Sequence, residues 1–469
     1  MPESYDLLII GAGSGGLTAA GFAAQLGAKV ALVERERVGG DCTWSGCVPS
    51  KALRYAARMA HQARTAARFG VAAAPVQVEM EGVRRYVRQA IAAVYRHETP
   101  DALARAGIEV VFGAAQFVDA HTLRAGERIL SARKFLIATG ARPHIPPIPG
   151  LEEVPFLTYL QIFDNTTLPN RLLVIGAGAV GVELAHAYQR LGSQVMLVDE
   201  RLLPTEEPEV AGVMGRVLAQ DGLQFVPGLV SAVRQEGAEI VIQVGERALR
   251  GDILLVATGR QPNIAGLGLD RAGVAHSPAG ILVDDYLRTS ARHIFAAGDC
   301  VAGNPQFTPV AGWQAFQAAR NALLPGNSRG FSAVVPYTLF TDPEIAHVGL
   351  SEAEARRRHG DGVRVTRWKL ERVDRAVTED ACDGFIKVTH TTKGRVLGAT
   401  IVADRAGEVI TEFALAMRHN LTLRDIASAI HAYPTYATGA MRLAADVAGR
   451  AALDGFSGRV LRVLHRLFR

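Results

Sequence analysis

The chain has 469 residues, 49% of them hydrophobic and 21% charged, a balance typical of a globular protein with two to four domains. Its formal net charge of +5 is small for this length and is not concentrated in one region, which argues against nucleic acid as a partner. No apolar run is long enough to span a bilayer, and the first one begins at residue 5, so we expect no signal peptide. The four cysteines are too few and too scattered for a secreted disulfide framework, and we expect a cytoplasmic protein.

The N-terminal segment predicts a dinucleotide-binding unit. An apolar run enters a turn with Gly11, Gly13 and Gly16, and a helical pattern follows. In this fingerprint the first glycine permits a tight turn, the second lets the backbone approach a pyrophosphate, and the third lets helix and strand pack closely. Glu34 ends the next apolar run, where its carboxylate would accept hydrogen bonds from a ribose diol.

Two cysteines five positions apart follow in GGDCTWSGCVPSK, residues 39–51. On a regular helix Cys42 and Cys47 would point about 140° apart, so a bond between them requires a distorted first turn, which Gly46 and Pro49 permit. The positive end of the following helix would stabilise a thiolate. Zinc requires about four ligands and no second cluster with suitable spacing is present, so the pattern favours a redox-active pair and no metal cofactor.

The dinucleotide pattern then recurs. LLIIGAGSGGLTAA (7–20) is repeated as LLVIGAGAVGVELA (172–185), with its glycines at Gly176, Gly178 and Gly181. Asp199 lies 23 positions after the first of these glycines, as Glu34 does after Gly11. A carboxylate there binds an unmodified ribose and repels a 2′-phosphate, which favours NADH, although Arg201 leaves NADPH open. Two such units indicate an electron relay, with FAD in the first and NAD(P)H in the second.

The rest of the chain is less repetitive. LIATGARP (136–143) is echoed by LVATGRQP (255–262), and IFAAGDC (294–300) predicts another buried strand that ends in a polar turn. Residues 308–324 predict a helix. From about residue 331 the pattern changes to strands and helices without glycine-rich turns, which indicates a separate α+β domain, and a basic amphipathic helix begins at residue 455.

The ordered set of motifs resembles the flavoprotein disulfide reductases, which include glutathione reductase, lipoamide dehydrogenase and mercuric reductase. The matching segments are GAGSGG, GGDCTWSGCVPSK, LIATGARP, GAGAVGVELA, LVATGRQPN, FAAGDC, FTPVAGWQA and FTDPEIAHVGLSEAEA. This resemblance implies an α/β homodimer with two Rossmann-like dinucleotide-binding domains and a C-terminal α+β dimerisation domain. We therefore expect an FAD-binding domain at 1–148, an NAD(P)-binding domain at 149–262, a central segment completing the FAD site at 263–330, and a dimerisation domain with its basic tail at 331–469.

The same resemblance implies roles for individual residues. Cys47 would lie against the flavin as the charge-transfer thiolate, and Cys42 would be the interchange thiol that attacks the substrate. Lys51 would lie near the flavin N5 and pair with Glu183, because a lysine buried beside a flavin needs a counter-charge. Asp299 would bind the ribityl chain. Further cofactor contacts are expected at Gly40, Thr139, Gly140, Gly259, Val310 and Ala311.

The chain departs from the family in IHAYPTYATG, residues 430–439. Disulfide-reducing members have a His-Pro…Glu motif there, which serves the partner subunit as an acid–base pair. Here Tyr433 takes the place of the histidine and Thr438 that of the glutamate, while His431 lies two residues early. Tyrosine, with a pKa of about 10, is a poor base near neutral pH, so efficient reduction of glutathione disulfide or lipoamide is not expected unless His431 substitutes. His431 could equally be a helix-end or surface histidine.

Two other features leave alternatives open. Asp41 stands where the family usually has threonine, and its carboxylate could raise the pKa of Cys42, bind an incoming cation or cap a helix. The C-terminal tail could make a weak contact with an anionic membrane surface, or it could pack on the partner subunit or on its own domain. Cys300 and Cys382 are single and are expected to be structural.

These observations predict an FAD-dependent NAD(P)H oxidoreductase in which electrons pass through a Cys42–Cys47 disulfide to an acceptor. The acceptor could be a metal ion such as Hg(II), a quinone or an unusual disulfide. The protein is similar to mercuric reductase, but we expect neither that enzyme's C-terminal cysteine pair, since residues 459–469 read RVLRVLHRLFR, nor its N-terminal metal-binding module. The alternatives are a lipoamide dehydrogenase-like enzyme that uses His431, and a flavin-bearing redox sensor with little turnover.

Overall fold

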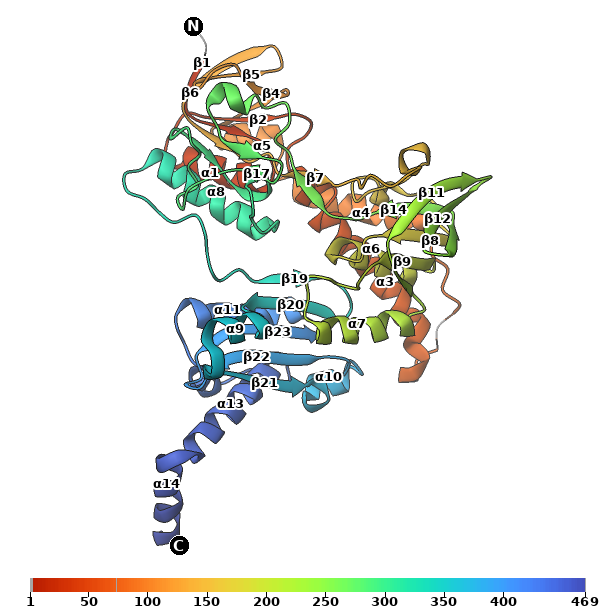
Figure 1. Ribbon diagram of the computed structural model, residues 1–469, viewed down its shortest axis with the longest axis vertical. Coiled ribbons are helices and arrows are strands. Elements are labelled where there is room, and N and C mark those ends of the chain that lie inside the picture. Colours follow the sequence, from red (N-terminus) through yellow and green to blue (C-terminus); the bar gives the residue numbers. More distant parts are fainter. Residues whose placement is uncertain (1–2, 73, 469) are drawn as a thin grey trace. The chain divides into compact units, whose positions relative to one another are not determined.

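The computed structural model describes residues 3–72 and 74–468, which form two compact units. Unit 1 contains the chain up to Leu202 together with residues 222–332. Unit 2 contains residues 203–221 together with the chain from Ala333 onward. Figure 1 labels the helices and strands of both units.

Unit 1 begins with a largely parallel sheet. Its strands follow the order β3-β2-β1-β6-β5-β4, and β18 pairs in parallel with β6. The strands are β1 (Glu3–Ile10), β2 (Val30–Glu34), β3 (Ile108–Phe112), β4 (Ala115–Phe117), β5 (Thr122–Ala125), β6 (Arg128–Ile137) and β18 (Ile294–Ala296).

The apolar run of β1 is explained by burial on both faces of this sheet. Leu7 and Ile9 belong to a core that includes α1 (Ser14–Gln25) and α8 (Thr308–Leu323). The alternate residues, Leu8 and Ile10, belong to a second core on the opposite face. A strand buried on both sides has no polar alternation, so it reads as one continuous hydrophobic segment.

The second half of unit 1 repeats this design. A parallel sheet with the order β10-β9-β8-β14 reproduces the order β3-β2-β1-β6 of the first sheet, so the sequence repeat is also a structural repeat. Its elements are β8 (Arg171–Ile175), α6 (Ala179–Leu191), β9 (Gln194–Asp199), β10 (Gln224–Pro227) and β14 (Ile253–Val256). An antiparallel sheet of β11 (Val230–Glu236), β12 (Glu239–Val244) and β13 (Arg247–Gly251) is inserted before β14.

The echoed Ala-Thr-Gly segments meet in space. The strands that follow them, β7 (Ala141–Pro143) and β15 (Arg260–Pro262), pair antiparallel with each other. A short hairpin of β16 (His276–Ser277) and β17 (Gly280–Ile281) lies between β15 and β18 in sequence. The cysteine motif and the helical stretch that follows it form α2 (Gly40–Trp44), α3 (Cys47–Thr65), α4 (Met80–Tyr95) and α5 (Pro100–Arg105).

Unit 2 is built on a five-stranded antiparallel sheet with the order β19-β20-β23-β22-β21. The strands are β19 (Tyr337–Leu339), β20 (Glu344–Gly349), β21 (Val363–Lys369), β22 (Phe385–Thr391) and β23 (Val396–Ala403). Its helices are α7 (Pro208–Gln220), α9 (Glu352–His359), α10 (Asp374–Thr378), α11 (Ala406–Arg418), α12 (Leu423–Ser428), α13 (Ala437–Leu453) and α14 (Gly455–Leu467). Ile386, Ile401, Phe413 and Leu443 join the sheet to α11 and α13 in one core.

The helix α7 is notable because its sequence position lies inside the range 149–262, between β9 and β10, whereas its packing assigns it to unit 2.

Among the described residues, none of the helices combines the length and the apolarity needed to cross a membrane.

Candidate functional site

The two cysteines lie on either side of a break between helices. Cys42 is in α2, and Cys47 is the first residue of α3. A side chain at Gly46 would place its Cβ 2.7 Å from the carbonyl oxygen of Asp41, so only glycine fits this turn. The expected distortion thus takes the form of a full helix break, and both thiols are free in this structure.

The paired sulfurs hold one proton between them. The pKa of Cys47 is lowered to about 6, mainly by a hydrogen bond from the Cys42 thiol. A hydrogen bond from the Thr308 hydroxyl at 3.3 Å and the charge of Lys51 lower it further, whereas burial opposes ionisation. The same sulfur–sulfur hydrogen bond, reinforced by burial, raises the pKa of Cys42 well above its usual range. At neutral pH the reduced pair therefore consists of a Cys47 thiolate and a Cys42 thiol.

Thr308 is a contact that the sequence did not predict. It belongs to the FTPVAGWQA motif at the start of α8, 261 positions after Cys47, and only the fold brings the two side chains together. The motif is recognisable in the sequence, but nothing in it distinguishes the Thr308 side chain from the neighbouring Val310 and Ala311.

Replacing Thr308 by valine is expected to raise the pKa of Cys47, because a hydrogen bond to the thiolate is lost. The rate of alkylation of the reduced protein by iodoacetamide, measured against pH, reports the thiolate. In the wild type the rate should rise with a midpoint near pH 6, and in Thr308→Val the midpoint should move upward. Thr308→Ser keeps the hydroxyl and serves as the matched control. An unchanged midpoint in Thr308→Val would contradict this account.

Lys51 and Glu183 form the ion pair that the sequence predicted. Lys51 is on α3, one turn beyond Cys47, and its ammonium lies 3.0 Å from the Glu183 carboxylate on α6. The carboxylate is largely buried, so the lysine provides its counter-charge. The pair joins the cysteine helix to the helix that follows the second glycine turn.

The first glycine turn fits a dinucleotide. A Cβ at Gly11 would lie 2.4 Å from the carbonyl oxygen of Ala138, and one at Gly16 would lie 1.8 Å from that of Gly11. The carboxylate of Glu34 accepts the backbone N–H groups of Ala12 at 2.9 Å and Glu36 at 2.8 Å, which fixes the turn beside the strand end. The turn is thus held by hydrogen bonds to its backbone and has glycine at its closest backbone contacts, as the tight turn and close helix–strand packing of a pyrophosphate site require.

Gly13 and Gly40 bring the cysteine helix to this turn. Gly40 has a φ of 61°, and a Cβ there would lie 2.6 Å from the Cα atom of Gly13. No side chain fits between the two backbones, so α2 begins directly beside the predicted phosphate-binding turn. This close approach is the structural reason for the glycine at position 40 of the cysteine motif.

The second glycine turn has the same construction. A Cβ at Gly176 would lie 2.4 Å from the carbonyl oxygen of Ala257, and one at Gly181 would lie 1.8 Å from that of Gly176. Gly178 faces open space, because a Cβ at that position would have no atom within 4 Å. Asp199 accepts the N–H groups of Ala177 and Glu200, each at 2.7 Å, as Glu34 does in the first turn. These residues fit a second dinucleotide.

The remaining predicted cofactor residues lie at strand ends and helix starts of unit 1. The Thr139 hydroxyl donates to the carbonyl oxygen of Asn263 at 2.7 Å, and the Gly259 carbonyl accepts the N–H of His144 at 2.9 Å. Gly140 and Gly259 adopt φ values of 67° and 118°, which favour glycine. Val310 and Ala311 are in the first turn of α8. Their cofactor contacts stay predictions.

Asp41 is joined to Asp299 through Arg260. The Arg260 guanidinium lies 2.7 Å from the Asp299 carboxylate and 3.1 Å from that of Asp41, which also accepts the Tyr159 hydroxyl at 3.0 Å. Burial raises the pKa of Asp299 even beside this arginine. The capping interpretation of Asp41 is wrong, because α2 has Gly39 at its N-cap position and no side-chain cap. No pattern in the sequence points to these partners, which lie 118 and 219 positions away.

The C-terminal candidates all belong to unit 2, where each side chain has a local partner. Tyr433 is 67% exposed, and its hydroxyl donates to Asp374 at 2.9 Å, which raises the pKa of the tyrosine. His431 contacts Glu412 through Nε2 at 2.8 Å and the carbonyl oxygen of Ala429 through Nδ1 at 3.0 Å. Both ring nitrogens thus face an oxygen acceptor within unit 2. Thr438 is buried, and its hydroxyl donates to the carbonyl oxygen of Thr435.

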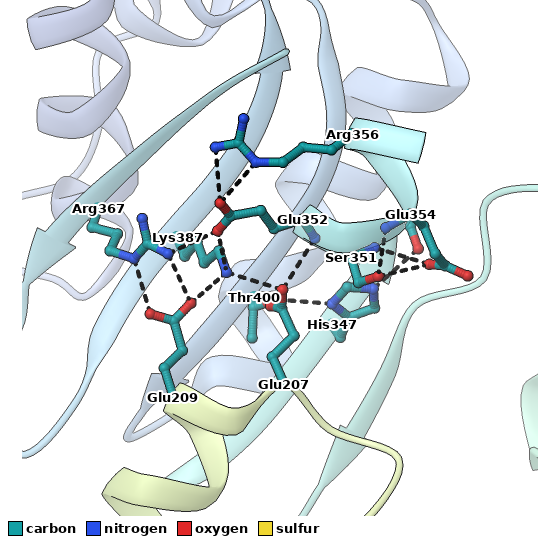
Figure 2. Close-up of polar contacts among 11 residues, drawn as sticks. Glu207, Glu209, His347, Ser351, Glu352, Glu354, Arg356, Arg367, Lys387 and Thr400 are labelled. Atoms are coloured by element: carbon teal, nitrogen blue, oxygen red, sulfur yellow. Dashed lines mark hydrogen bonds and ion pairs between the residues drawn. The ribbon is translucent and has the colours of Figure 1, made fainter. Parts of the chain in front are cut away.

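A cluster of three carboxylates in unit 2 has the spacing of a metal site. One oxygen from each of Glu207, Glu209 and Glu352 lies within 4.8 Å of the others. Figure 2 shows the Lys387 ammonium directed at all three carboxylates, with Arg367 beside them. A cation of the chain thus already balances this cluster, and we assign it to the stability of unit 2 rather than to chemistry.

Comparisons with known proteins agree with this geometry. The family model described as pyridine nucleotide-disulphide oxidoreductase matches residues 5–315, and the dimerisation domain of the same family matches residues 335–444. The chain is 36% identical over 444 residues to a mercuric reductase of Bacillus cereus, covering 93% of this chain and 70% of that protein. It is 35% identical over 466 residues to a dihydrolipoyl dehydrogenase of Thermus scotoductus, covering 94% and 97%.

A solved structure is similar over nearly the whole chain. The Cu(II) complex of the HOCl-induced flavoprotein disulfide reductase RclA from Escherichia coli matches with a TM-score of 0.84 and 27% identity, covering 93% of this chain and 99% of that one. The α/β fold with two dinucleotide-binding regions and a C-terminal dimerisation domain is thereby confirmed. The chain belongs to the pyridine nucleotide-disulphide oxidoreductase family, whose members use FAD and NAD(P)H.

Proposed function

We propose that the protein passes electrons from NADH, through FAD and the Cys42–Cys47 pair, to a thiophilic metal ion such as Hg(II). The observation that carries this proposal is the thiolate–thiol pair at the break between α2 and α3, combined with the contacts that tie the His431 ring to Glu412 and Ala429. A quinone or an unusual disulfide is the alternative acceptor.

The chain's own residues define what happens at the sulfurs. Bound FAD supplies the chemistry that takes two electrons from NAD(P)H and delivers them to the cysteine disulfide. Two electrons and one proton convert that disulfide into a Cys42 thiol and a Cys47 thiolate, which is the protonation state that their pKa values favour. The Cys42–Cys47 bond re-forms when the two electrons pass to the acceptor and the remaining proton is released.

A soft metal ion suits this site better than a disulfide does. Thiolates prefer soft cations, and binding such a cation needs no proton donor. Reducing a substrate disulfide requires a proton for the leaving thiolate, which a near-neutral histidine supplies. Tyr433 has a raised pKa and is held by Asp374, and His431 is held at both nitrogens. The names of the relatives, a mercuric reductase and a Cu(II) complex of RclA, support the same class of acceptor.

Asp199 supports NADH as the donor. Its carboxylate ends β9 and faces the second glycine turn, where a 2′-phosphate would be repelled. Arg201 lies two residues further on, so the preference is tested by comparing kcat/KM for NADH and NADPH.

The acceptor is tested by steady-state oxidation of NADH with Hg(II), Cu(II), quinones, lipoamide and glutathione disulfide. We expect a metal ion to support turnover and the two disulfides to support little. Tyr433→His should raise disulfide reduction by about a hundredfold, the usual gain from a positioned general acid or base, whereas Tyr433→Phe should not. Faster turnover of wild-type protein with lipoamide than with any metal ion would overturn the proposal.

One observation favours a second candidate, lipoamide dehydrogenase-like chemistry. His431 and Glu412 form a histidine–carboxylate pair at 2.8 Å, although the glutamate comes from α11 rather than from the His-Pro…Glu motif. If this pair served as the acid–base group, His431→Gln would abolish lipoamide turnover and leave metal-dependent NADH oxidation unchanged.

A further inference from the structure

The terminal helix α14 separates its side chains into two faces. At about 100° per residue, its apolar residues fall within an arc of about 160°, formed by Val460, Leu461, Val463, Leu464, Leu467 and Phe468. The opposite side carries Arg459, Arg462, His465 and Arg466. No aspartate or glutamate occurs anywhere from residue 455 to 469.

The apolar face of α14 is open to solvent. All six apolar side chains are exposed, with Leu467 at 74% and Phe468 at 88%. The main neighbour of the helix is the end of α13, where a Cβ at Gly458 would lie 1.8 Å from the carbonyl oxygen of Leu453 and where Arg462 donates to the same carbonyl. Figure 1 shows α14 continuing past α13 away from the five-stranded sheet of unit 2.

The helix α14 lies outside the part of the chain that matches the family models. The match to the family's dimerisation domain ends at residue 444, eleven positions before α14 begins at Gly455. The helix also has 13 residues, too few to cross a bilayer. A short helix with an apolar face and an arginine-rich polar face is typical of segments that lie in the plane of a membrane interface.

We propose that α14 is a docking surface for an anionic lipid bilayer. The apolar face would enter the boundary between headgroups and acyl chains, and the arginines would contact the lipid phosphates. Charge complementarity decides in favour of lipid, because a helix that packs on another copy of this chain gains nothing from three arginines with no carboxylate among them. Docking would bring the protein to a membrane surface, independently of which acceptor it uses.

The test is co-sedimentation of the FAD-loaded, full-length protein with vesicles. We expect binding to an equimolar mixture of phosphatidylcholine and phosphatidylglycerol, weaker binding to phosphatidylcholine alone, and release by salt. Arg459→Gln/Arg466→Gln should weaken binding by about 25-fold, on the order of fivefold for each arginine. Leu464→Gln/Leu467→Gln should also weaken it. Arg357→Gln/Arg358→Gln, on exposed positions of α9, makes the same charge change and should have little effect.

Three outcomes would overturn the proposal. One is a wild-type protein that does not sediment with the anionic vesicles. Another is equal loss of binding in the α9 control, which would indicate attraction by net charge alone. The third is a shift in oligomeric state of Leu464→Gln/Leu467→Gln without a change in vesicle binding, which would assign the apolar face to a second copy of the chain. NADH oxidation should be the same in all these variants. A failure of the membrane-docking proposal can therefore be distinguished from a failure of the proposed function.

Discussion

Cys42→Ala and Cys47→Ser should each reduce metal-dependent NADH oxidation by about a thousandfold or more, the scale of loss that follows removal of a reacting sulfur nucleophile. Neither variant can form the disulfide that receives the electrons. FAD content should stay normal, because the glycine turns and Glu34 do not depend on the thiols.

The two variants should differ because the Cys42 and Cys47 thiols have different pKa values. Cys42→Ala removes the hydrogen bond that is the largest cause of the low pKa of Cys47, so the thiolate should titrate above pH 6. Anaerobic titration with NADH should produce a long-wavelength band from the thiolate beside the flavin, and this band should be absent in Cys47→Ser. Cys382→Ser, at a single cysteine of unit 2, is the control and should retain activity. Full turnover in either pair variant would contradict the assigned route.

Lys387→Met should lower the free energy of unfolding by about 3 kcal/mol, because it removes the one buried ammonium that contacts all three carboxylates and leaves them close together. The Lys387 side chain is only 4% exposed, and its ammonium lies 2.9 Å from Glu207, 3.1 Å from Glu352 and in contact with Glu209 (Figure 2). Methionine fills a similar volume, so the loss reports the charge rather than a cavity. Because Glu207 and Glu209 come from the 203–221 segment, the variant should loosen α7 from the sheet of unit 2.

The pH dependence identifies the cause of this loss. Burial opposes ionisation of Glu352, but hydrogen bonds from Arg356, Lys387 and Arg367 hold its pKa down at about 2. A depressed carboxylate pKa contributes stability above the unfolded value of about 4.3 and loses it as the pH falls toward 2. The wild type should therefore lose stability over this range, and Lys387→Met should lose less. Urea midpoints at several pH values measure the loss of stability in both proteins. The control is Lys369→Met, at an exposed position of β21. Equal midpoints for Lys387→Met and the wild type would contradict the assignment.

Local patterns in the sequence predicted the parts of the site that are set by local backbone geometry. The glycine turns with Glu34 and Asp199 recur at equal spacing because each unit needs the same close contacts between strand, turn and helix. The Lys51–Glu183 pair was found through the family resemblance and is present. These signals occupy short windows of sequence, which is why they can be recognised without a structure.

Contacts between distant segments could not be predicted in the same way. Thr308, which lowers the pKa of Cys47, and Arg260, which joins Asp41 to Asp299, have no sequence signal that links them to their partners. The helix α7 belongs to unit 2, and Lys387, which bonds Glu207 at its N-cap position, follows that glutamate by 180 positions. Such pairings are fixed by packing and charge balance after the sheets have formed.

Differential alkylation of the cysteines, followed by mass spectrometry, tests the electron route most directly. Oxidised protein should leave positions 42 and 47 unlabelled, NADH under anaerobic conditions should make both reactive, and one equivalent of a two-electron acceptor should protect both again. Equal labelling of the two sulfurs before and after NADH, in protein that still turns over, would show that electrons reach the acceptor by another path.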